Sequence, residues 1–168
     1  MAGAFETQII HTKWIFYVLH HPMTKAILTE KERAFVENHV PLTVEFSERY
    51  IPLEDVRKRK DEFILKPMDA YASKGIYAAG RECTQEQWNQ VTEDLYGQGY
   101  VCQQYMTDNI DFAWGDGEWH PYMNMPGLYT YNGAFQGVLM RTCCGENIIV
   151  AHDNERTLPV YTVTGLRS

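Results

Sequence analysis

The sequence lacks any excess of basic residues. Its formal net charge is −7, and residues 67–168 carry the whole acidic excess, with five Lys and Arg against twelve Asp and Glu. Residues 1–66 hold ten of each sign. A general nucleic-acid-binding protein presents a basic face to the phosphate backbone. The composition therefore argues against a nucleic-acid partner.

The chain also lacks a long apolar run, a basic leader and a patterned set of cysteines. The apolar stretch at residues 15–19 is too short to span a bilayer, and the N-terminus has no basic segment typical of a secretory signal. The four cysteines show neither metal-ligand spacing nor a secreted disulfide framework: Cys83, Cys102, Cys143 and Cys144. We therefore expect reduced thiols in a cytoplasmic protein that has no membrane partner.

The chain has enough apolar sequence for a globular domain, since 45% of its 168 residues are hydrophobic. Apolar spacing predicts a helix over residues 12–28, which Pro22 would interrupt. Thr29 and Glu32 have the spacing of a capping box and predict a second helix, over residues 30–38. The elements expected next are a strand at 43–46, a helix from Pro52 through 57–60, a strand at 63–66, its hairpin partner at 76–79, a helix from a Thr84–Gln87 capping box to about Gly97, and a strand at 100–106.

Turn signals dominate the last third of the chain. The pair Asn132-Gly133 predicts a type I′ turn between strands at 128–131 and 135–140, and residues 114–119 predict another hairpin turn. Two further strands are expected at 148–151 and 160–163. Helices followed by a mixed unit and then by strands predict an α+β protein.

One lysine stands at a point suited to an anionic ligand. Lys66 ends a predicted strand, and the loop of small residues that follows, 68–75, lets backbone N–H groups come close to a ligand. Ser73 and Lys74 would add a hydroxyl and a charge, and Gly75 would allow a close backbone approach. A nucleoside triphosphate fits such a site, although the G-x-x-x-x-G-K-[ST] spacing of a Walker loop is absent.

Two amides interrupt the apolar strand at residues 100–106. A buried glutamine needs matched donors and acceptors, and an adenine edge supplies them. The sequence leaves two readings open: Gln103 and Gln104 contact a base, or they face water on an edge strand.

Five segments together resemble the carboxyl-terminal part of circularly permuted ATP-grasp proteins of the glutathionylspermidine synthase type. They occur in the family's order and cover most of the chain. They are HTKWIF at 11–16, LTEKERAF at 28–35 with HVPLT at 39–43, ILKP at 64–67 with SKG at 73–75, YVCQQY at 100–105, and the hairpin from Asn132-Gly133 to Arg141.

The resemblance implies a partial ATP-grasp fold, with N-terminal helices, a small α+β lid subdomain and a β-rich C-terminal part. The chain would form a single ATP-grasp-like portion over residues 1–168. Residues 1–60 would be mainly helical, and residues 107–168 would be β-rich. Residues 61–106 would contain the strand with the second lysine, the glycine-bearing loop, a helix and the hinge strand. The activity implied is that of an ATP-dependent carboxylate–amine ligase that acts through an acyl phosphate. The resemblance implies three sets of ATP contacts. Lys13 and Lys66 would hold the α- and β-phosphates, and the loop with Ser73, Lys74 and Gly75 would cover the β- and γ-phosphates. The adenine base would lie at Gln103, Gln104 and Tyr105, where the N–H after Gln104 would donate to a ring nitrogen.

The sequence also departs from the family pattern. Lys25 resembles the first lysine motif locally, although Lys13 stands at a more natural distance from the next segment. Gln104 replaces the usual hinge acid, and Glu6 stands where a basic or neutral residue is expected. The family's magnesium ligands lie upstream of the first lysine, so we expect the Mg²⁺ ligands outside this chain, in an upstream half of the enzyme or in a partner, with a homo-oligomer also open.

Two other classes of function remain open. The chain is alternatively a non-catalytic nucleotide-binding or assembly module that retains the phosphate cradle. It is otherwise a structural α+β domain, in which case Lys13 and Lys66 would lie far apart. The acid and amine substrates do not follow from the sequence.

Overall fold

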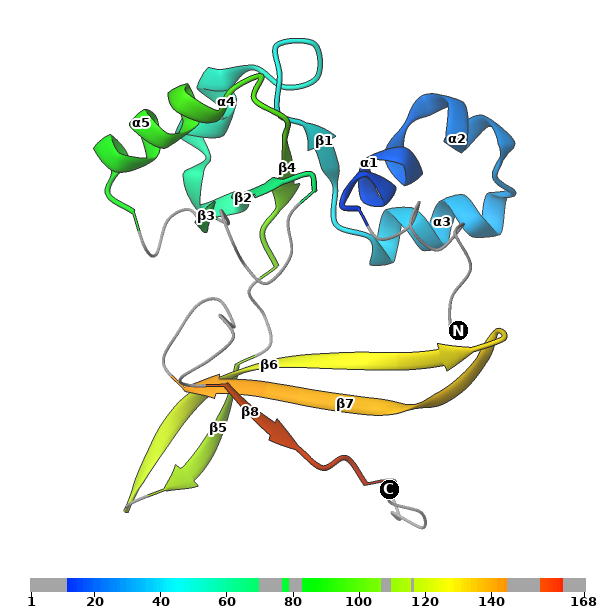
Figure 1. The fold of residues 1–168 in the computed structure, drawn as a ribbon, viewed down its shortest axis with the longest axis vertical. Coiled ribbons are helices and arrows are strands. Elements are labelled where there is room, and N and C mark those ends of the chain that lie inside the picture. Colours follow the sequence, from blue (N-terminus) through cyan, green and yellow to red (C-terminus); the bar gives the residue numbers. More distant parts are fainter. Residues whose placement is uncertain are drawn as a thin grey trace. The chain divides into compact units, whose positions relative to one another are not determined.

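The computed structural model of the chain describes residues 12–69, 77–78, 83–106, 110–115, 117–144 and 155–161. The chain divides into two compact units, residues 1–106 and residues 107–168. Each unit contains a four-stranded antiparallel sheet, and the α-helices belong to the first unit (Figure 1). The expected α+β class is confirmed.

Three short helices form the N-terminal part of the first unit: α1 (Trp14–His20), α2 (Pro22–Ile27) and α3 (Glu30–His39). The interruption expected at Pro22 is confirmed, because proline lacks the N–H that a helix interior needs and stands here in the first turn of α2. The capping box of α3 is also confirmed. The Thr29 hydroxyl accepts from the Glu32 N–H, and the Glu32 carboxylate accepts from the Thr29 N–H at 2.8 Å.

The sheet of the first unit has the order β1-β4-β2-β3, with antiparallel pairing throughout. The hairpin neighbours β2 and β3 pair as the sequence predicts, whereas the insertion of β4 between β1 and β2 has no local signal. β1 lies at the edge of the sheet and packs against α1, and Figure 1 shows α1 to α3 gathered beside it. The bounds are β1 Thr43–Glu45, β2 Phe63–Pro67, β3 Tyr77–Ala78 and β4 Tyr100–Gln104, which ends two residues before the expected limit at 106.

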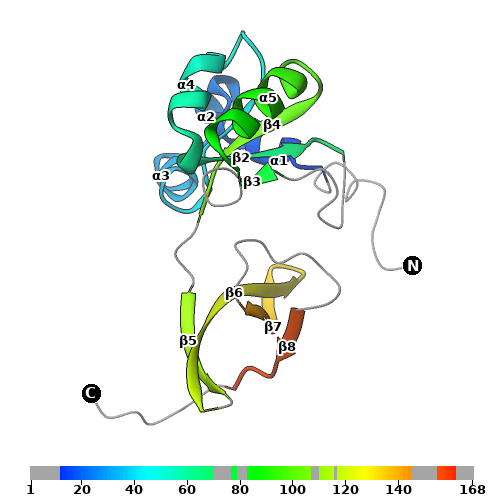
Figure 2. The ribbon, with the colours of Figure 1, turned by 90° about the vertical axis from the view of Figure 1, so that its left-hand side faces the viewer.

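Two helices cover one face of this sheet and enclose the core. α4 (Leu53–Lys58) and α5 (Gln85–Leu95) lie side by side (Figure 2), and Trp88 of α5 is fully buried. Its indole N–H donates to the Val56 carbonyl at 3.2 Å. The helix expected to continue through residues 57–60 ends at Lys58, and Lys60–Glu62 forms a separate 3₁₀ turn. The core residues are Phe46, Val56, Phe63, Leu65, Trp88 and Cys102.

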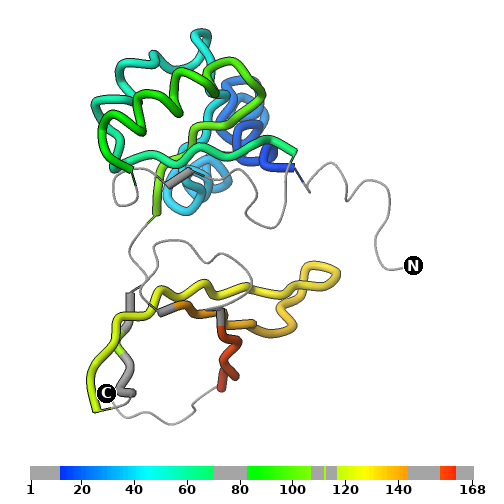
Figure 3. The backbone as a smooth tube through the Cα atoms, turned by 60° about the vertical axis from the view of Figure 1, so that its left-hand side comes forward, coloured from blue at the N-terminus to red at the C-terminus, as the bar shows by residue number. Residues whose placement is uncertain are grey.

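The second unit is a sheet in the order β5-β6-β7-β8. Figure 3 shows β6 and β7 as one long hairpin. Its turn has φ of 47° at Asn132 and 73° at Gly133, which confirms the predicted type I′ turn. The bounds are β5 Ile110–Gly115, β6 Glu118–Tyr131, β7 Ala134–Cys144 and β8 Glu155–Leu158.

The sequence predicted two further strands in the C-terminal part, and neither is found among the described residues. The strand expected at 160–163 is wrong as far as the chain is described, because β8 ends at Leu158 and neither Val160 nor Tyr161 is in a strand. The strand expected at 148–151 lies outside the described residues. A sequence with several β-prone runs near its end does not say which run finds a partner, since pairing depends on the neighbouring strand.

Two further features bear on the setting of the protein. None of the helices in the described ranges is long and apolar enough to cross a membrane. Cys102 is a free thiol, as expected, and the side chain of Cys144 lies outside the described ones. Burial raises the pKa of Cys102 to about 12, so its thiol stays protonated at neutral pH.

Candidate functional site

Lys66 lies on the sheet face opposite the helical core. In β2 it is two residues from Ile64, which stands directly opposite Gln103 of β4, and Gln103 stands opposite Thr43 of β1. Side chains alternate between the two faces of a strand, so Lys66, Gln103 and Thr43 share one face. Leu65, between Ile64 and Lys66, points into the core instead.

The start of α1 is attached to the end of β2. The backbone N–H of Lys13, the residue before α1, donates to the Met68 carbonyl at 3.3 Å, and the Met68 N–H donates to the Gly99 carbonyl at 3.2 Å. Because Met68 is only two residues beyond Lys66, these bonds bring the two lysines into one region. The structure therefore places the backbone of Lys13 close to the end of the strand that carries Lys66, and the convergence of the two ammonium groups on one phosphate site stays a prediction.

The charge of Lys13 acts on Lys66. Burial lowers the pKa of Lys66, and the positive charge of Lys13 lowers that pKa further. Burial also lowers the pKa of Lys13, while the negative charge of Asp69 opposes that shift. An anion would stabilise the Lys66 ammonium, since it would offset both the burial and the repulsion from Lys13.

Gln103 is buried, with only 5% of its surface exposed, and its side chain bonds to protein groups at both ends. Its Oε1 accepts from the Lys66 ammonium at 2.6 Å, and its Nε2 donates to the Thr43 hydroxyl at 2.8 Å. Gln104, the next residue, is exposed. Gln104 therefore faces water, although β4 is an interior strand and not the edge strand of the water-facing reading. For Gln103 that reading is wrong, because its amide is buried and satisfied by protein groups.

The expected purine contact through the N–H after Gln104 is wrong in this structure. That N–H belongs to Tyr105 and donates to the Glu62 carbonyl at 2.8 Å, and the N–H of Gln104 donates to the Leu42 carbonyl at 2.8 Å. A backbone amide has one hydrogen, so neither group has a donor left for a ring nitrogen. The tight seating of β4 between two neighbours uses the donors that a free hinge strand would offer.

The other predicted contacts separate into those placed elsewhere and those not described. Lys25, the alternative first lysine, lies on α2 and forms an ion pair of 3.3 Å with Glu37 of α3. Of the two, Lys13 is the one whose charge acts on Lys66. The predicted loop contacts Ser73, Lys74 and Gly75 lie outside the described residues.

Two residues near the lysines were not foreseen as part of the site. Thr43 was expected only as the start of a strand, yet it is fully buried and bonds to Gln103. Asp69 follows the strand of Lys66 and acts on the charge of Lys13. The only sequence signal for Thr43 was a hydroxyl within a short strand, because its partner is 60 positions away along the chain.

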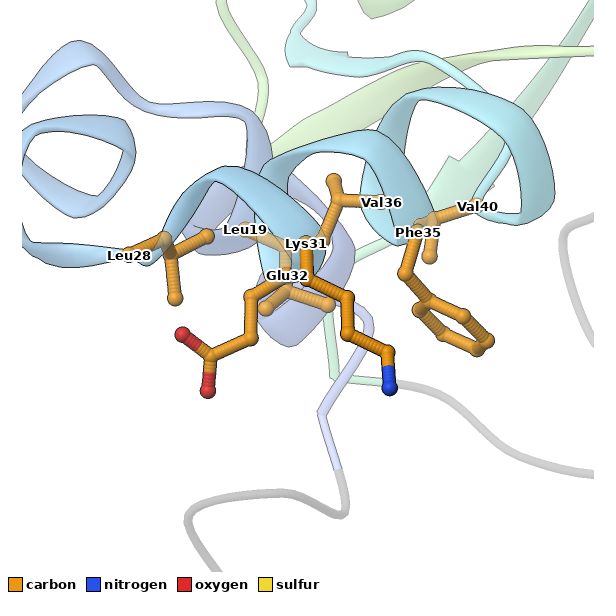
Figure 4. Close-up of a pocket in the computed structure, with 7 residues that line it drawn as sticks. All are labelled: Leu19, Leu28, Lys31, Glu32, Phe35, Val36 and Val40. Carbon is orange, nitrogen blue, oxygen red and sulfur yellow. The ribbon is translucent and has the colours of Figure 1, made fainter.

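An apolar pocket of about 360 Å³ lies elsewhere in the first unit, between α1 and α3 (Figure 4). Leu19, Leu28, Phe35, Val36 and Val40 line it together with Lys31 and Glu32, and none of the predicted ATP contacts is among them. Figure 4 shows the side chains of Lys31 and Glu32 lying between those of Leu28 and Phe35. The pocket therefore shares no lining residue with the predicted phosphate site of Lys13 and Lys66.

The described residues include no group of three or more His, Cys, Asp or Glu side chains placed to hold a metal ion. A scan against models of known protein families found no match, and a search among curated proteins found no related sequence.

Proposed function

We propose that the first unit binds the phosphates of ATP through Lys13 and Lys66, as the ATP-binding portion of an ATP-dependent carboxylate–amine ligase. The observation that supports the proposal is the hydrogen bond that attaches the Lys13 backbone to Met68, just beyond Lys66, together with the effect of the Lys13 charge on Lys66. The two lysines come from segments about fifty residues apart, and a structural domain has no need to place two positive charges together. Polyphosphate is the ligand class that matches two point charges at one place.

The resemblance to ATP-grasp proteins supports the nucleotide and the reaction type. In that reaction a carboxylate is phosphorylated by ATP to an acyl phosphate, and an amine then displaces the phosphate. The role of Lys13 and Lys66 would be to neutralise charge on the phosphate oxygens and to hold the chain of phosphates in line. Half-burial strengthens this effect, because charges interact more strongly away from water.

Magnesium would bridge the phosphates in such a reaction and neutralise further charge. Hard cations take several oxygen ligands, and the part of the chain that the structure describes offers no acidic cluster of that kind. The metal ligands are therefore not assigned to the described residues. An upstream segment or a partner polypeptide would supply them.

The test is calorimetric titration of the full chain with ATP and magnesium. Lys13→Ala and Lys66→Ala should each weaken binding by about 1–3 kcal/mol, the range for a charge-assisted contact. Lys25→Ala is the matched control, because it removes an exposed lysine of the same unit that pairs with Glu37. It should leave the affinity unchanged.

Two results would speak against the proposal. If Lys25→Ala weakens ATP binding and Lys13→Ala does not, the first phosphate contact is Lys25 of α2 and not Lys13. Binding that none of the three variants changes would place the nucleotide elsewhere. ATP binding without ligation after addition of an upstream segment carrying metal ligands would favour the non-catalytic module over the ligase.

A further inference from the structure

Lys66 is the first member of a chain of three hydrogen bonds, of which the middle one is buried. Its ammonium donates to Gln103 Oε1 at 2.6 Å, Gln103 Nε2 donates to Thr43 Oγ1 at 2.8 Å, and Thr43 Oγ1 donates to the Pro41 carbonyl at 2.9 Å. Thr43 and Gln103 are both at least 95% buried. The same Pro41 carbonyl lies 3.2 Å from His20 Nε2 on α1.

The direction of every bond in this chain follows from the groups at its two ends. An ammonium only donates, so the oxygen of the Gln103 amide must face Lys66 and its NH₂ must face Thr43. A carbonyl only accepts, so the single hydrogen of the Thr43 hydroxyl points to Pro41 and its oxygen is left to accept from Gln103. The Thr43 hydroxyl therefore holds the Gln103 amide in the orientation that Lys66 requires.

The sheet fixes the geometry. β1, β4 and β2 are consecutive in the sheet, and Thr43 stands directly opposite Gln103 while Lys66 stands diagonal to it. Diagonal neighbours on one face are within reach of long side chains. A glutamine in β4 thus spans from a short residue on one neighbour to a long one on the other.

We propose that Gln103 and Thr43 are positioning residues, which hold the Lys66 ammonium in the orientation used for phosphate, and that Gln103 does not read the adenine base. The inference rests on the proposed function for the role of Lys66, whereas the hydrogen-bonded chain itself does not depend on it. A neutral amide suits this task, because it accepts from the ammonium and leaves the whole positive charge for the ligand. A carboxylate at the same place would hold Lys66 as firmly but would cancel its charge.

The experiment follows Lys66 itself and its effect on ATP in the full chain. The pH titration of the Lys66 Cε carbon by NMR, assigned with Lys66→Arg, reports the hydrogen bond directly. Calorimetry with ATP and magnesium reports the consequence. Lys13, and through it Asp69, are the charged neighbours of the site and stay unchanged in every variant.

The two Gln103 variants should shift the pKa of Lys66 in opposite directions. Gln103→Leu removes the acceptor of the charged form and should lower the pKa of Lys66, whereas Gln103→Glu adds a negative charge and should raise it. Both should weaken ATP binding, by about tenfold each. Thr43→Val leaves the Gln103 NH₂ without its acceptor, so the amide is held less firmly against Lys66 and both readouts should shift in the direction of Gln103→Leu by a smaller amount. Thr43→Ser keeps the hydroxyl and should restore both readouts.

A merely structural role would give a different pattern. Equal effects of Thr43→Val and Thr43→Ser, or a Lys66 titration that none of the variants moves, would overturn the inference. ATP affinity that follows stability rather than the Lys66 titration would overturn it as well, and thermal unfolding of each variant supplies that comparison. If the unaltered chain binds no ATP while the Lys66 titration moves as expected, the proposed function fails and the hydrogen-bonded chain stands.

Discussion

Lys66 lies in a half-buried position, and its surroundings act on the charge of its ammonium in both directions. Burial and the neighbouring charge of Lys13 favour the neutral amine and lower the pKa. The carbonyl oxygen of Gln103 accepts from the ammonium and favours the charged form. An anion that binds Lys66 would offset the burial and the repulsion from Lys13. It would therefore stabilise this ammonium more than the ammonium of an ordinary surface lysine.

The pH dependence of ATP binding follows from this lowered pKa. The protonated form of Lys66 binds phosphate, so affinity should fall as pH rises through its folded pKa, which lies below the usual 10.5. The last ionisation of a phosphate, near pH 6, is complete long before then and does not mask the effect. Calorimetric titrations between pH 7 and about pH 10 should therefore show a falling affinity.

Lys66→Arg provides the control for that measurement. A guanidinium stays protonated over the whole range, so the variant should bind ATP with a flatter pH profile. An affinity in the native chain that stays constant up to pH 10 would show that Lys66 does not contact the phosphates in its charged form.

The sequence predicted the position of some side chains of the site and not the role of others. The position of Lys66 at the end of a strand was predicted from the run of apolar residues before it. The role of Gln103 was not, because a glutamine in an apolar strand is compatible with several buried partners. Its actual partners come from β1 and β2, and only the paired sheet brings them together.

At the scale of elements, local signals decide where helices begin. The capping boxes at Thr29–Glu32 and Thr84–Gln87 both form as predicted. In the second, the Thr84 hydroxyl accepts from the Gln87 N–H at 3.2 Å, and Gln87 Oε1 accepts from the Thr84 N–H at 2.8 Å. These bonds satisfy backbone donors that the first turn of a helix leaves unpaired.

Thr84→Ala should destabilise the first unit by about 1 kcal/mol, because it removes the cap of the helix that carries the buried Trp88. Urea unfolding followed by tryptophan fluorescence measures the change. Thr84→Ser keeps the hydroxyl and should stay close to the native stability. Equal stability of Thr84→Ala and the native chain would mean that packing of Trp88 alone fixes the start of α5.

At the scale of the whole molecule, the two units differ in how much they bury. The core of Phe46, Val56, Leu65 and Trp88 belongs entirely to residues 1–106. In the second unit, Thr142 and Cys143 are the buried residues among those described, while Phe112 and Trp119 are 65% and 63% exposed. Burial of apolar surface is the main source of stability, so the first unit carries most of it.

Residues 1–106 alone should therefore unfold cooperatively, with a midpoint near that of the corresponding transition in the full chain. Thermal unfolding followed by near-ultraviolet circular dichroism measures this. In the same fragment Trp88→Ala should abolish the transition, since truncating a buried tryptophan costs about 3–5 kcal/mol. A fragment without fixed tertiary signals would show that residues after 106 take part in its folding.

The sequence by itself determined the type and the approximate ends of most described elements. Caps such as Thr29 with Glu32, the break at Pro22 and the turn at Asn132-Gly133 act between residues at most a few positions apart. Such interactions leave the same mark in the sequence wherever the segment lies in the fold. The apolar run before Lys66 also marked it as a cation at the end of a strand, whereas Lys13 was singled out by the family resemblance.

The tertiary structure decided the order β1-β4-β2-β3, the place of the Lys13 backbone close to the end of the strand that carries Lys66, and the bond between Thr43 and Gln103 across 60 positions of the chain. Strand order depends on the free energy of packing whole elements against a shared core, and no local pattern encodes it. For the same reason, the seating of β4 between two strands, which uses the N–H groups of Gln104 and Tyr105, became visible only in the folded sheet.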